Sequence, residues 1–258
     1  MHRVIADFTL AVRSLRKSPA LTATALITLA LGIGATTAIF SVVNAVLLRP
    51  LPYRDPGRLV LLWADLTKRN VRDFPVFPGD IPDLRAGVPA LRDVSAISTT
   101  TATVLGEGAA PERIRMAVVL PNFFSTLGID MTLGRPFVES DGTPQPAQAP
   151  NGGEAANAAR PRVPDYVVLS HEFWTRRFGA DAAIVGRSVN IGGQSREIVG
   201  VLPPGFEILF PPGTGVEPRP DLYQATRIDL ATASRITASM RVFGRLADGA
   251  TLASAQQQ

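Results

Sequence analysis

"ALTATALITLALGIGATTAIFSVVNAVLLRPLPY", residues 20–53, decides the fold, because its first 29 residues carry no charge and the run ends at Arg49. A helix of that length spans roughly 43 Å, while the hydrocarbon core of a bilayer is about 30 Å thick. The apolar region of a cleaved signal sequence has about 7–15 residues, and Asn44–Leu48 is a poor cleavage sequence. A buried helix of a soluble protein rarely needs so long an uncharged stretch. The sequence therefore predicts a transmembrane helix over residues 19–49.

The residues before this run have a different pattern. Apolar side chains recur there at helical spacing, and basic residues occupy positions between them. The apolar residues are Val4, Ile5, Phe8, Val12 and Leu15. This pattern is typical of a helix in the membrane interface, so residues 1–18 are expected to form an amphipathic interfacial helix. Ser18 and Pro19 favour the start of the next helix. Four basic residues precede the run and four follow it closely, so charge does not decide which end faces the cytoplasm.

Within the run, Ala30, Gly34 and Ala38 recur every four residues, with Gly32 and Ala35 nearby. Small residues at this spacing let a second helix approach closely, because helix association in lipid depends on packing. The alternative is that small residues are simply common in transmembrane helices. If the three residues do pack against a helix, we expect that helix to come from outside this chain, since no second long apolar run follows.

Composition excludes several classes of protein. The 258 residues carry a net charge of +4, and the basic residues are scattered rather than gathered in a stripe, so no nucleic-acid partner is expected. The chain has no cysteine, which excludes disulfides, thiolate zinc sites and a cysteine nucleophile. Its length is sufficient for one large domain or two small ones.

After the apolar run, short strands alternate with short helices. This predicts an α+β protein in which one transmembrane helix precedes a mixed α/β core domain over residues 58–247, with a division into two small subdomains left open. Strands are expected at 58–63, 94–97, 102–105, 112–120, 166–170 and 241–247, helices at 79–85, 122–128 and 171–179, and a hairpin at 188–201 around Gly192-Gly193. Asn122 and Thr251 are expected to cap helices, the second of which begins in residues 248–258.

Residues 141–164 differ from the rest of this domain. They contain five prolines, no aromatic residue and no apolar periodicity. The composition predicts a flexible insertion loop between two structured halves. A functional role for the loop stays open, although exposed polar loops commonly tolerate insertions.

The sequence shows no constellation of residues for catalysis. Neither lysine follows a glycine, so the phosphate loop of an ATPase is absent. Two histidines without cysteine cannot form the usual zinc sites. Ser170-His171-Glu172 are consecutive and point in different directions, and Gly193-x-Ser195 lacks the closing glycine of a nucleophile elbow. We therefore expect no catalytic, cofactor-binding or metal-binding residue, and no enzymatic activity.

Other polar and aromatic residues have plainer interpretations. Glu112 and Glu197 each adjoin an arginine, which favours pairing at the surface. His171 begins a predicted helix and is expected to cap it or to lie at the surface. The aromatic residues Trp63, Trp174 and Tyr223 are expected to pack in the core or at an interface.

Several segments together resemble MacB/FtsX-type ABC transporter permeases. Their first transmembrane helix is similar to residues 27–53, "ITLALGIGATTAIFSVVNAVLLRPLPY". The sequence of this segment is most similar to the orphan duplicated-permease branch of the family. Five further segments are similar to their periplasmic core domain: "RLVLLW" from residue 58, "PERIRMAVVLPNFFSTLGIDMTLGRPF" from 111, "VVLSHEFWTRRFGADAAIVGRSVNIGG" from 167, "EIVGVLPPGFEI" from 197 and "FGRLADGATLASAQ" from 243.

The resemblance implies a place in the bacterial inner membrane, with the N-terminus in the cytoplasm and the main domain in the periplasm. It also implies a separate ABC ATPase subunit, a periplasmic adaptor protein in some members, contact with membrane lipid, and a homodimer or pseudo-dimer. Family members carry further transmembrane helices after the external domain. The chain ends before any such helix, so a fragment or a truncated product is expected.

We therefore predict the periplasmic core portion of an ABC transporter permease. It would couple ATP hydrolysis by a separate ATPase to movements of the external domain, in efflux or in mechanotransmission across the envelope. The alternative is a single-pass anchored binding protein without ATPase coupling. An enzyme of the cell envelope is a third possibility, disfavoured because no acid–base or nucleophile constellation is visible.

Overall fold

The computed structural model of the chain describes residues 16–43, 53–66, 70–106, 109–144, 163–237 and 239–257. These residues divide between two units, Met1–Leu51 and Pro52–Gln258. Three expectations fall wholly or partly outside the described residues: the interfacial helix at 1–18, the end of the transmembrane helix at 44–49 and most of the insertion loop at 141–164.

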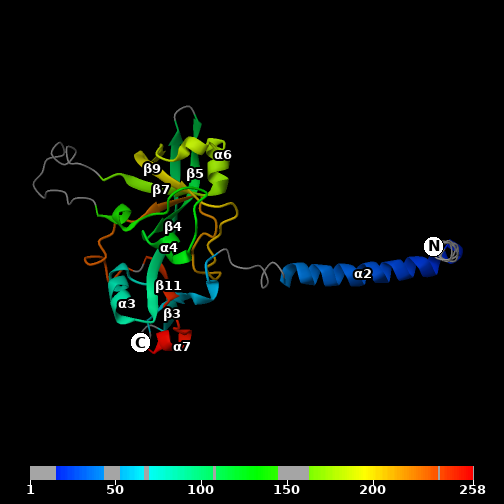
Figure 1. Cartoon of the computed structure of the whole chain (residues 1–258). Helices are drawn as coiled ribbons and strands as arrows, with labels where there is room; N and C mark the ends of the chain where they lie inside the picture. The colour runs from blue at the N-terminus through cyan, green and yellow to red at the C-terminus, as the bar shows by residue number, and fades with distance from the viewer. Residues whose placement is uncertain are drawn as a thin grey trace, which may run out of the picture. The chain divides into compact units, whose positions relative to one another are not determined.

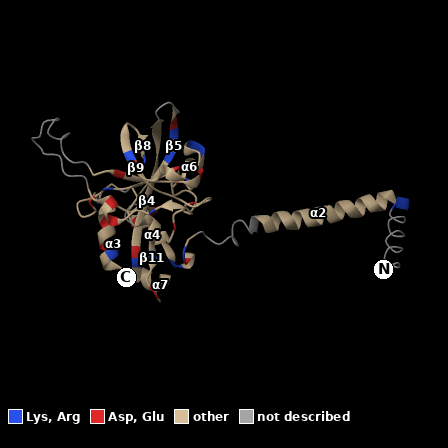
Figure 2. Ribbon diagram, turned by 45° about the horizontal axis from the view of Figure 1, so that its top comes forward, with Lys and Arg blue, Asp and Glu red and all other residues tan. Residues whose placement is uncertain are grey.

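The first unit contains the helix α2, Pro19–Val43 (Figure 1). The Thr22 N–H donates to the Ser18 carbonyl at 3.1 Å, so the helix begins where the sequence predicts. Proline suits the first helical position because its missing N–H has no partner to bond there. Figure 2 shows α2 in tan, the colour of uncharged residues, with basic residues in blue just before its N-terminal end.

The second unit is built on one nine-stranded sheet. Its neighbouring strands follow the order β1-β11-β4-β5-β10-β7-β9-β6, and β8 pairs with β4 and β9. The strands are β1 (Leu59–Leu62), β4 (Leu91–Gly106), β5 (Ala109–Val119), β6 (Leu133–Gly134), β7 (Asp165–Leu169), β8 (Ser188–Ile191), β9 (Gln194–Val201), β10 (Leu222–Ala225) and β11 (Arg241–Leu246). A separate two-stranded sheet joins β2 (Ala64–Leu66) to β3 (Val71–Phe74).

Among the described residues, four short α-helices accompany these strands: α3 (Ile81–Gly87), α4 (Phe123–Leu127), α6 (His171–Phe178) and α7 (Leu252–Gln256). In both views α3 lies beside the β11 end of the sheet and α6 lies beside β5 (Figures 1 and 2). The strand pairs β5–β10 and β7–β9 are parallel, and the other pairs are antiparallel. The unit is therefore a mixed α/β domain, as predicted.

Because β8 bridges β4 and β9, the strands β4, β5, β10, β7, β9 and β8 form a closed ring of pairings. Side chains alternate across a strand, so each ring strand sends every second residue inward. All the ring strands contribute to one buried apolar cluster, with residues such as Val104, Ile114, Leu222, Val167, Ile198 and Val189. Phe173 and Trp174 of α6 join the same cluster.

The opposite face of the sheet is covered by α4. Phe123 and Phe124 are fully buried there, and the Phe123 ring lies 5.4 Å from the Phe243 ring and 6.3 Å from the Tyr223 ring. A third cluster, around Ile81 of α3, covers β11 and the first half of β4. The division into two small subdomains is not seen, since Pro52–Gln258 forms one compact unit.

Local signals placed several elements correctly. Gly192 and Gly193 form the turn that joins β8 to β9, with φ of 59° and 86°. A tight hairpin turn of this kind requires positive φ at both positions, which glycine adopts readily. Gly128 and Gly179 end α4 and α6 in the left-handed conformation. Thr251 accepts from the Ser254 N–H and caps α7.

Other local predictions were wrong. Asn122 precedes α4 but its side chain does not cap the helix; its Nδ2 instead donates to the Val94 carbonyl at 3.1 Å. The strands expected at 94–97 and 102–105 are parts of the single long strand β4. The sequence-based prediction also missed β2, β3, β6 and β10.

Candidate functional site

The described helix α2 fits a membrane environment. Its segment Pro19–Ser41 has 23 residues with a mean hydropathy of 1.8, and none of it is buried. A helix of this length spans about 35 Å, which is sufficient for a hydrocarbon core of about 30 Å. Large apolar side chains are open to the surroundings, from 59% exposed at Ile33 to 68% at Leu21. Such a surface requires lipid or another apolar partner.

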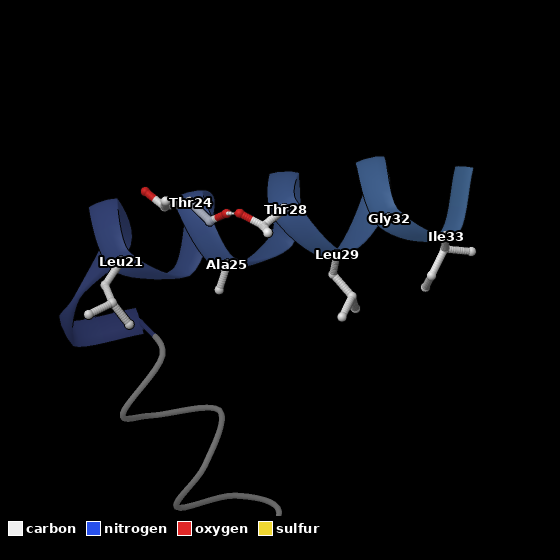
Figure 3. Close-up of a pocket in the computed structure, with 7 residues that line it drawn as sticks. All are labelled: Leu21, Thr24, Ala25, Thr28, Leu29, Gly32 and Ile33. Carbon is white, nitrogen blue, oxygen red and sulfur yellow. Dashed lines mark hydrogen bonds between the residues drawn. The ribbon is translucent and has the colours of Figure 1, made fainter. Parts of the chain in front are cut away.

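Four threonine hydroxyls of α2 donate hydrogen bonds to main-chain carbonyls four residues earlier. The donors are Thr22, Thr24, Thr28 and Thr36, at 3.0, 2.9, 2.8 and 2.6 Å. Figure 3 shows the Thr28 hydroxyl turned back toward Thr24. Because hydrocarbon offers no hydrogen-bond partner, these internal bonds make the hydroxyls compatible with a lipid environment.

The structure brings Ala30, Gly34 and Ala38 to one side of α2, since residues four apart in a helix share a face. A Cβ added at Gly34 would meet no atom within 4 Å, so this side is open to close approach. None of the Pro19–Ser41 window is buried by described residues, and the role of the three residues in helix packing stays a prediction.

A second side of α2 was missed by the sequence-based prediction. A shallow apolar hollow there is lined by Leu21, Thr24, Ala25, Thr28, Leu29, Gly32 and Ile33 (Figure 3). Gly32 and Gly34 are about 200° apart around the helix axis, so the hollow and the Ala30–Ala38 stripe lie on opposite sides. The signal in the sequence was the pair of small residues Ala25 and Gly32, seven positions apart.

In the second unit, charged side chains gather around Asp221, which immediately precedes β10. Its side chain is 7% exposed. The carboxylate accepts from the main-chain N–H of Arg115 at 2.9 Å, from Arg115 Nε at 3.2 Å and from Arg176 Nη2 at 3.1 Å. Glu217 pairs with Arg115 at 3.1 Å, and Glu112 pairs with Arg176 at 2.9 Å. We call these five residues the Asp221 cluster.

The Asp221 cluster joins three elements. Arg115 lies on β5, Arg176 lies on α6, and Asp221 leads into β10. The main chain strengthens the junction, because the Asp221 N–H donates to the Arg115 carbonyl at 2.8 Å and the Ser170 N–H donates to the Asp221 carbonyl at 3.0 Å. Ser170 is also the N-cap of α6, where its hydroxyl accepts from the Phe173 N–H at 3.1 Å.

The ionisation of these groups follows from the bonds. Burial alone would raise the pKa of Asp221, but the hydrogen bonds from Arg115 and Arg176 outweigh it and hold that pKa below its ordinary value. The bond to Asp221 raises the pKa of Arg115. Burial opposes the charge of Arg176, but its bonds to Glu112 and Asp221 raise its pKa overall.

A half-open hollow of about 330 Å³ lies beside the cluster, with Arg115, Arg176, Arg219, Glu172, Glu207 and Asp221 among its lining residues. Each of the three arginines bonds a carboxylate, and Glu172 accepts from the Gly205 N–H at 2.9 Å. A ligand of one charge sign would have to break existing pairs. The arrangement is therefore suited to joining elements rather than to acid–base chemistry, which needs a group poised to exchange a proton.

Residues singled out from the sequence have defined places. Glu112 does pair, but with Arg176 and Arg177 rather than with a sequence neighbour, because adjacent residues of a strand point to opposite faces. Tyr223 is 1% exposed and Trp174 is 8% exposed, which confirms their packing roles. The His171 ring lies 5.4 Å from the Trp174 ring at the start of α6. Among the described residues, no group of three potential metal ligands comes together.

Several solved structures are similar to this chain, and the one with a TM-score above 0.5 supports its fold. A domain assigned to a permease of Porphyromonas gingivalis matches 80% of this chain and 82% of its own length, with a TM-score of 0.54 and 12% identity. The extracellular domain of the noncanonic ABC-type transporter YknZ from Gram-positive bacteria matches 76% of this chain and 86% of its own length, with a TM-score of 0.48 and 17% identity. The periplasmic region of MacB from Actinobacillus actinomycetemcomitans covers 77% of this chain and 78% of its own length, with a TM-score of 0.48 and 13% identity.

No curated protein matches the chain. The sequence model of one family, described as the MacB-like periplasmic core domain, matches residues 22–258, which include most of α2 and all the described elements of the second unit. The match confirms the resemblance noted in the sequence. The chain therefore belongs to the MacB-like periplasmic core domain family of ABC transporter permeases.

Proposed function

We propose that this protein is the membrane-anchored, extracytoplasmic portion of an ABC transporter permease, which couples ATP hydrolysis by a separate ATPase to movements of its external domain. The observation that carries the proposal is the family match from residue 22 to residue 258, because it covers the apolar helix and the mixed domain as one unit. The movement would serve efflux or mechanotransmission across the envelope.

A separate protein is the proposed source of energy. The sequence contains no phosphate loop, and its two lysines, Lys17 and Lys68, do not follow a glycine. We infer that an ABC ATPase subunit binds on the cytoplasmic side and that the domain itself performs no catalysis. A periplasmic adaptor, membrane lipid and a second copy or pseudo-copy of the permease are the further partners proposed.

The topology of the domain supports a mechanical role. β1, the first described strand after the apolar helix, pairs antiparallel with β11, with Leu59 opposite Arg245 and Leu62 opposite Val242. β11 in turn pairs with β4, the longest strand of the sheet. A displacement that enters at β1 would therefore pass through β11 to β4.

Co-purification tests the ATPase coupling. An affinity-tagged protein, produced in its own cells and cross-linked in the membrane, is expected to bring down an ATP-binding protein that mass spectrometry identifies as an ABC ATPase. An equally tagged single-pass membrane protein serves as the control. Recovery of the protein without any ATPase, in a stable form that binds an envelope ligand, would favour the anchored binding protein instead.

A reporter fusion tests the orientation. A reporter active only in the periplasm, fused after Leu230, is expected to be active, because the proposal places the N-terminus in the cytoplasm and the domain outside it. The paired control is a cytoplasm-active reporter at the same position. Activity of that control alone would contradict the proposed topology.

A further inference from the structure

Arg245 is a buried cation near the end of β11. The residue is 7% exposed, and in the described part of the chain its guanidinium donates to main-chain carbonyls. Burial lowers the pKa of Arg245, and the nearby Arg58 charge lowers it further. Arginine nevertheless remains protonated in proteins, so a full positive charge is held there. Burying a charge costs considerable free energy unless the charge is well hydrogen-bonded, so the groups that the guanidinium bonds are of interest.

The guanidinium joins two separate segments of main chain. Arg245 Nη2 donates to the Arg54 carbonyl at 2.6 Å, and Nη1 donates to the Asp55 carbonyl at 3.3 Å. Nε donates to the Thr126 carbonyl at 2.7 Å, and Nη2 reaches the Leu127 carbonyl at 3.4 Å. One side chain therefore ties residues 54–55 and residues 126–127 to β11.

The second of these segments is the last turn of α4. The carbonyls at the end of a helix have no partner within the helix and form its negative end, so a cation is favourable there. The Leu127 carbonyl also accepts from the Arg54 N–H at 3.1 Å. The two segments that Arg245 joins are thus bonded to each other as well.

The close approach at this point requires a glycine. Gly128 follows α4 with φ of +69°, and a Cβ added there would lie 2.5 Å from the Cβ of Arg54. Non-bonded carbon atoms do not approach so closely. The chain at Arg54 therefore lies directly against the end of α4, with Arg245 bonded to both.

Residues 53–58 have further ties to the domain. The Tyr53 hydroxyl donates to the Glu207 carbonyl at 2.6 Å and accepts from the Leu209 N–H at 3.0 Å. Burial raises the pKa of Tyr53 to about 12, so the hydroxyl keeps its proton as a donor. Arg58 donates to the Leu246 carbonyl at 2.5 Å and pairs with Asp248 at 2.6 Å.

This segment is where the domain begins after the membrane helix. The described part of α2 ends at Val43, and Tyr53 is the next described residue along the chain. Along the chain, a movement of the helix would therefore reach residues 53–58 before it reaches β1, the first of the described strands. Whether the movement passes into the sheet depends on how firmly residues 53–58 are bonded to the rest of the domain.

We propose that Arg245 is the positioning residue that fixes the chain arriving from the membrane helix to β11 and α4, so that a pull on this chain moves the sheet instead of peeling the segment away. This inference rests on the proposed function, because it concerns the path by which helix movement reaches the domain. Lysine cannot replace arginine in this role, since a single ammonium group lacks the planar set of donors that reaches both segments.

Hydrogen–deuterium exchange of the whole chain in detergent micelles tests the proposal. The variants are Arg245→Lys and Arg245→Met, and the matched control is Arg241→Lys. Arg241 lies on the same strand and also donates to main-chain carbonyls, those of Thr214 at 2.8 Å and Asp73 at 2.9 Å, but it does not bond residues 53–58. Lysine retains the charge, so this variant remains informative if Arg245→Met does not fold.

We expect both Arg245 variants to speed the exchange of the Arg54 amide about tenfold, while amides of the ring strand β7 change less than about twofold. Arg241→Lys should leave the Arg54 amide as in the wild type. An Arg54 amide equally protected in Arg245→Lys and the wild type would overturn the proposal. An equal acceleration at Arg54 and in β7 would also overturn it, because it would show a general loss of stability instead of a local release.

The failure of this inference and that of the proposed function can be distinguished. The exchange experiment contains no ATPase, so its outcome depends only on how residues 53–58 are held. If the exchange result is as expected but no ATPase co-purifies with the protein, the attachment by Arg245 stands and the coupling function fails. If an ATPase co-purifies but the Arg54 amide is unaffected, the function stands and the assignment of Arg245 fails.

Discussion

The helix α2 and the interior of the closed strand ring are both strongly apolar, but the surroundings that they require differ. In α2 the apolar side chains point outward, and Ile33 is 59% exposed. In the ring they point inward, where Val167, Leu169 and Ile198 are fully buried. The ring provides its own apolar environment by closing on itself, whereas α2 has to obtain one from lipid or another apolar partner.

Charge is distributed accordingly. α2 has no charged residue between Pro19 and Val43. The sheet domain keeps its charges at the edges of the apolar clusters and pairs them, as at Asp221, or bonds them to carbonyls, as at Arg245. The apolar side chains thus face outward in α2, which suits a membrane, and inward in the sheet domain, which encloses its own core.

The largest effect is expected from emptying the domain core. Phe123→Ala should lower the free energy of unfolding of the sheet domain by about 3–5 kcal/mol, because it removes a fully buried ring that contacts Phe124, Phe243 and Tyr223. Denaturant unfolding followed by tryptophan fluorescence measures this loss. Ile33→Ala is the comparison on α2 and should leave domain stability unchanged; a similar loss there would show that α2 is packed in the protein core.

A charge in α2 should produce the next largest effect. Ile33→Asp is expected to disfavour membrane insertion by about 2.5–3.5 kcal/mol, the usual cost of an ionised side chain near the centre of a transmembrane helix. The fraction of protein resistant to alkaline extraction from membranes reports the change. Thr101→Asp, at an exposed position of β4, is the control and should remain fully membrane-bound. Unchanged extraction of Ile33→Asp would contradict the membrane role of α2.

Asp221 should make the stability of the sheet domain depend on pH in the acidic range. Its pKa is lowered in the folded state, so its contribution is complete above its unfolded value of about 3.9 and is lost as the pH falls through the lower folded value. Asp221→Asn should lose about 1.5–3 kcal/mol at pH 7. The difference from the wild type should shrink when urea unfolding is repeated below about pH 4. A difference that stayed constant would assign the effect to shape rather than to charge.

The smallest expected effect concerns the start of α6. Ser170→Ala removes the hydroxyl that accepts from the Phe173 N–H and should cost about 1 kcal/mol of domain stability. Ser170→Thr retains the acceptor and is the matched comparison. Equal thermal midpoints for the wild type and Ser170→Ala would show that the cap contributes little here.

The sequence predicted those elements whose causes are local. The length and lack of charge of α2, the paired glycines at Gly192-Gly193 and the left-handed glycine at Gly179 each act within a few residues. These signals could be read directly, and the family resemblance completed the assignment of the domain.

What the sequence did not predict depends on contacts between distant segments. β10 has only four residues and gains its order from β5 and β7, which are far away in the chain. Arg245 has an ordinary strand position, and its role depends on carbonyls at residues 54–55 and 126–127. No pattern of side chains marks a main-chain carbonyl as an acceptor, so such a site becomes visible only in the structure.

The pairing of β1 with β11 also has a consequence for synthesis. Among the described strands of the nine-stranded sheet, β1 is made first and β11 last, yet β1 pairs with β11. Contacts between segments so far apart in sequence form late and slow the overall folding reaction. The apolar Leu59–Leu62 segment therefore stays unpaired until β11 has been synthesised, and during that interval it is open to contacts that favour misfolding.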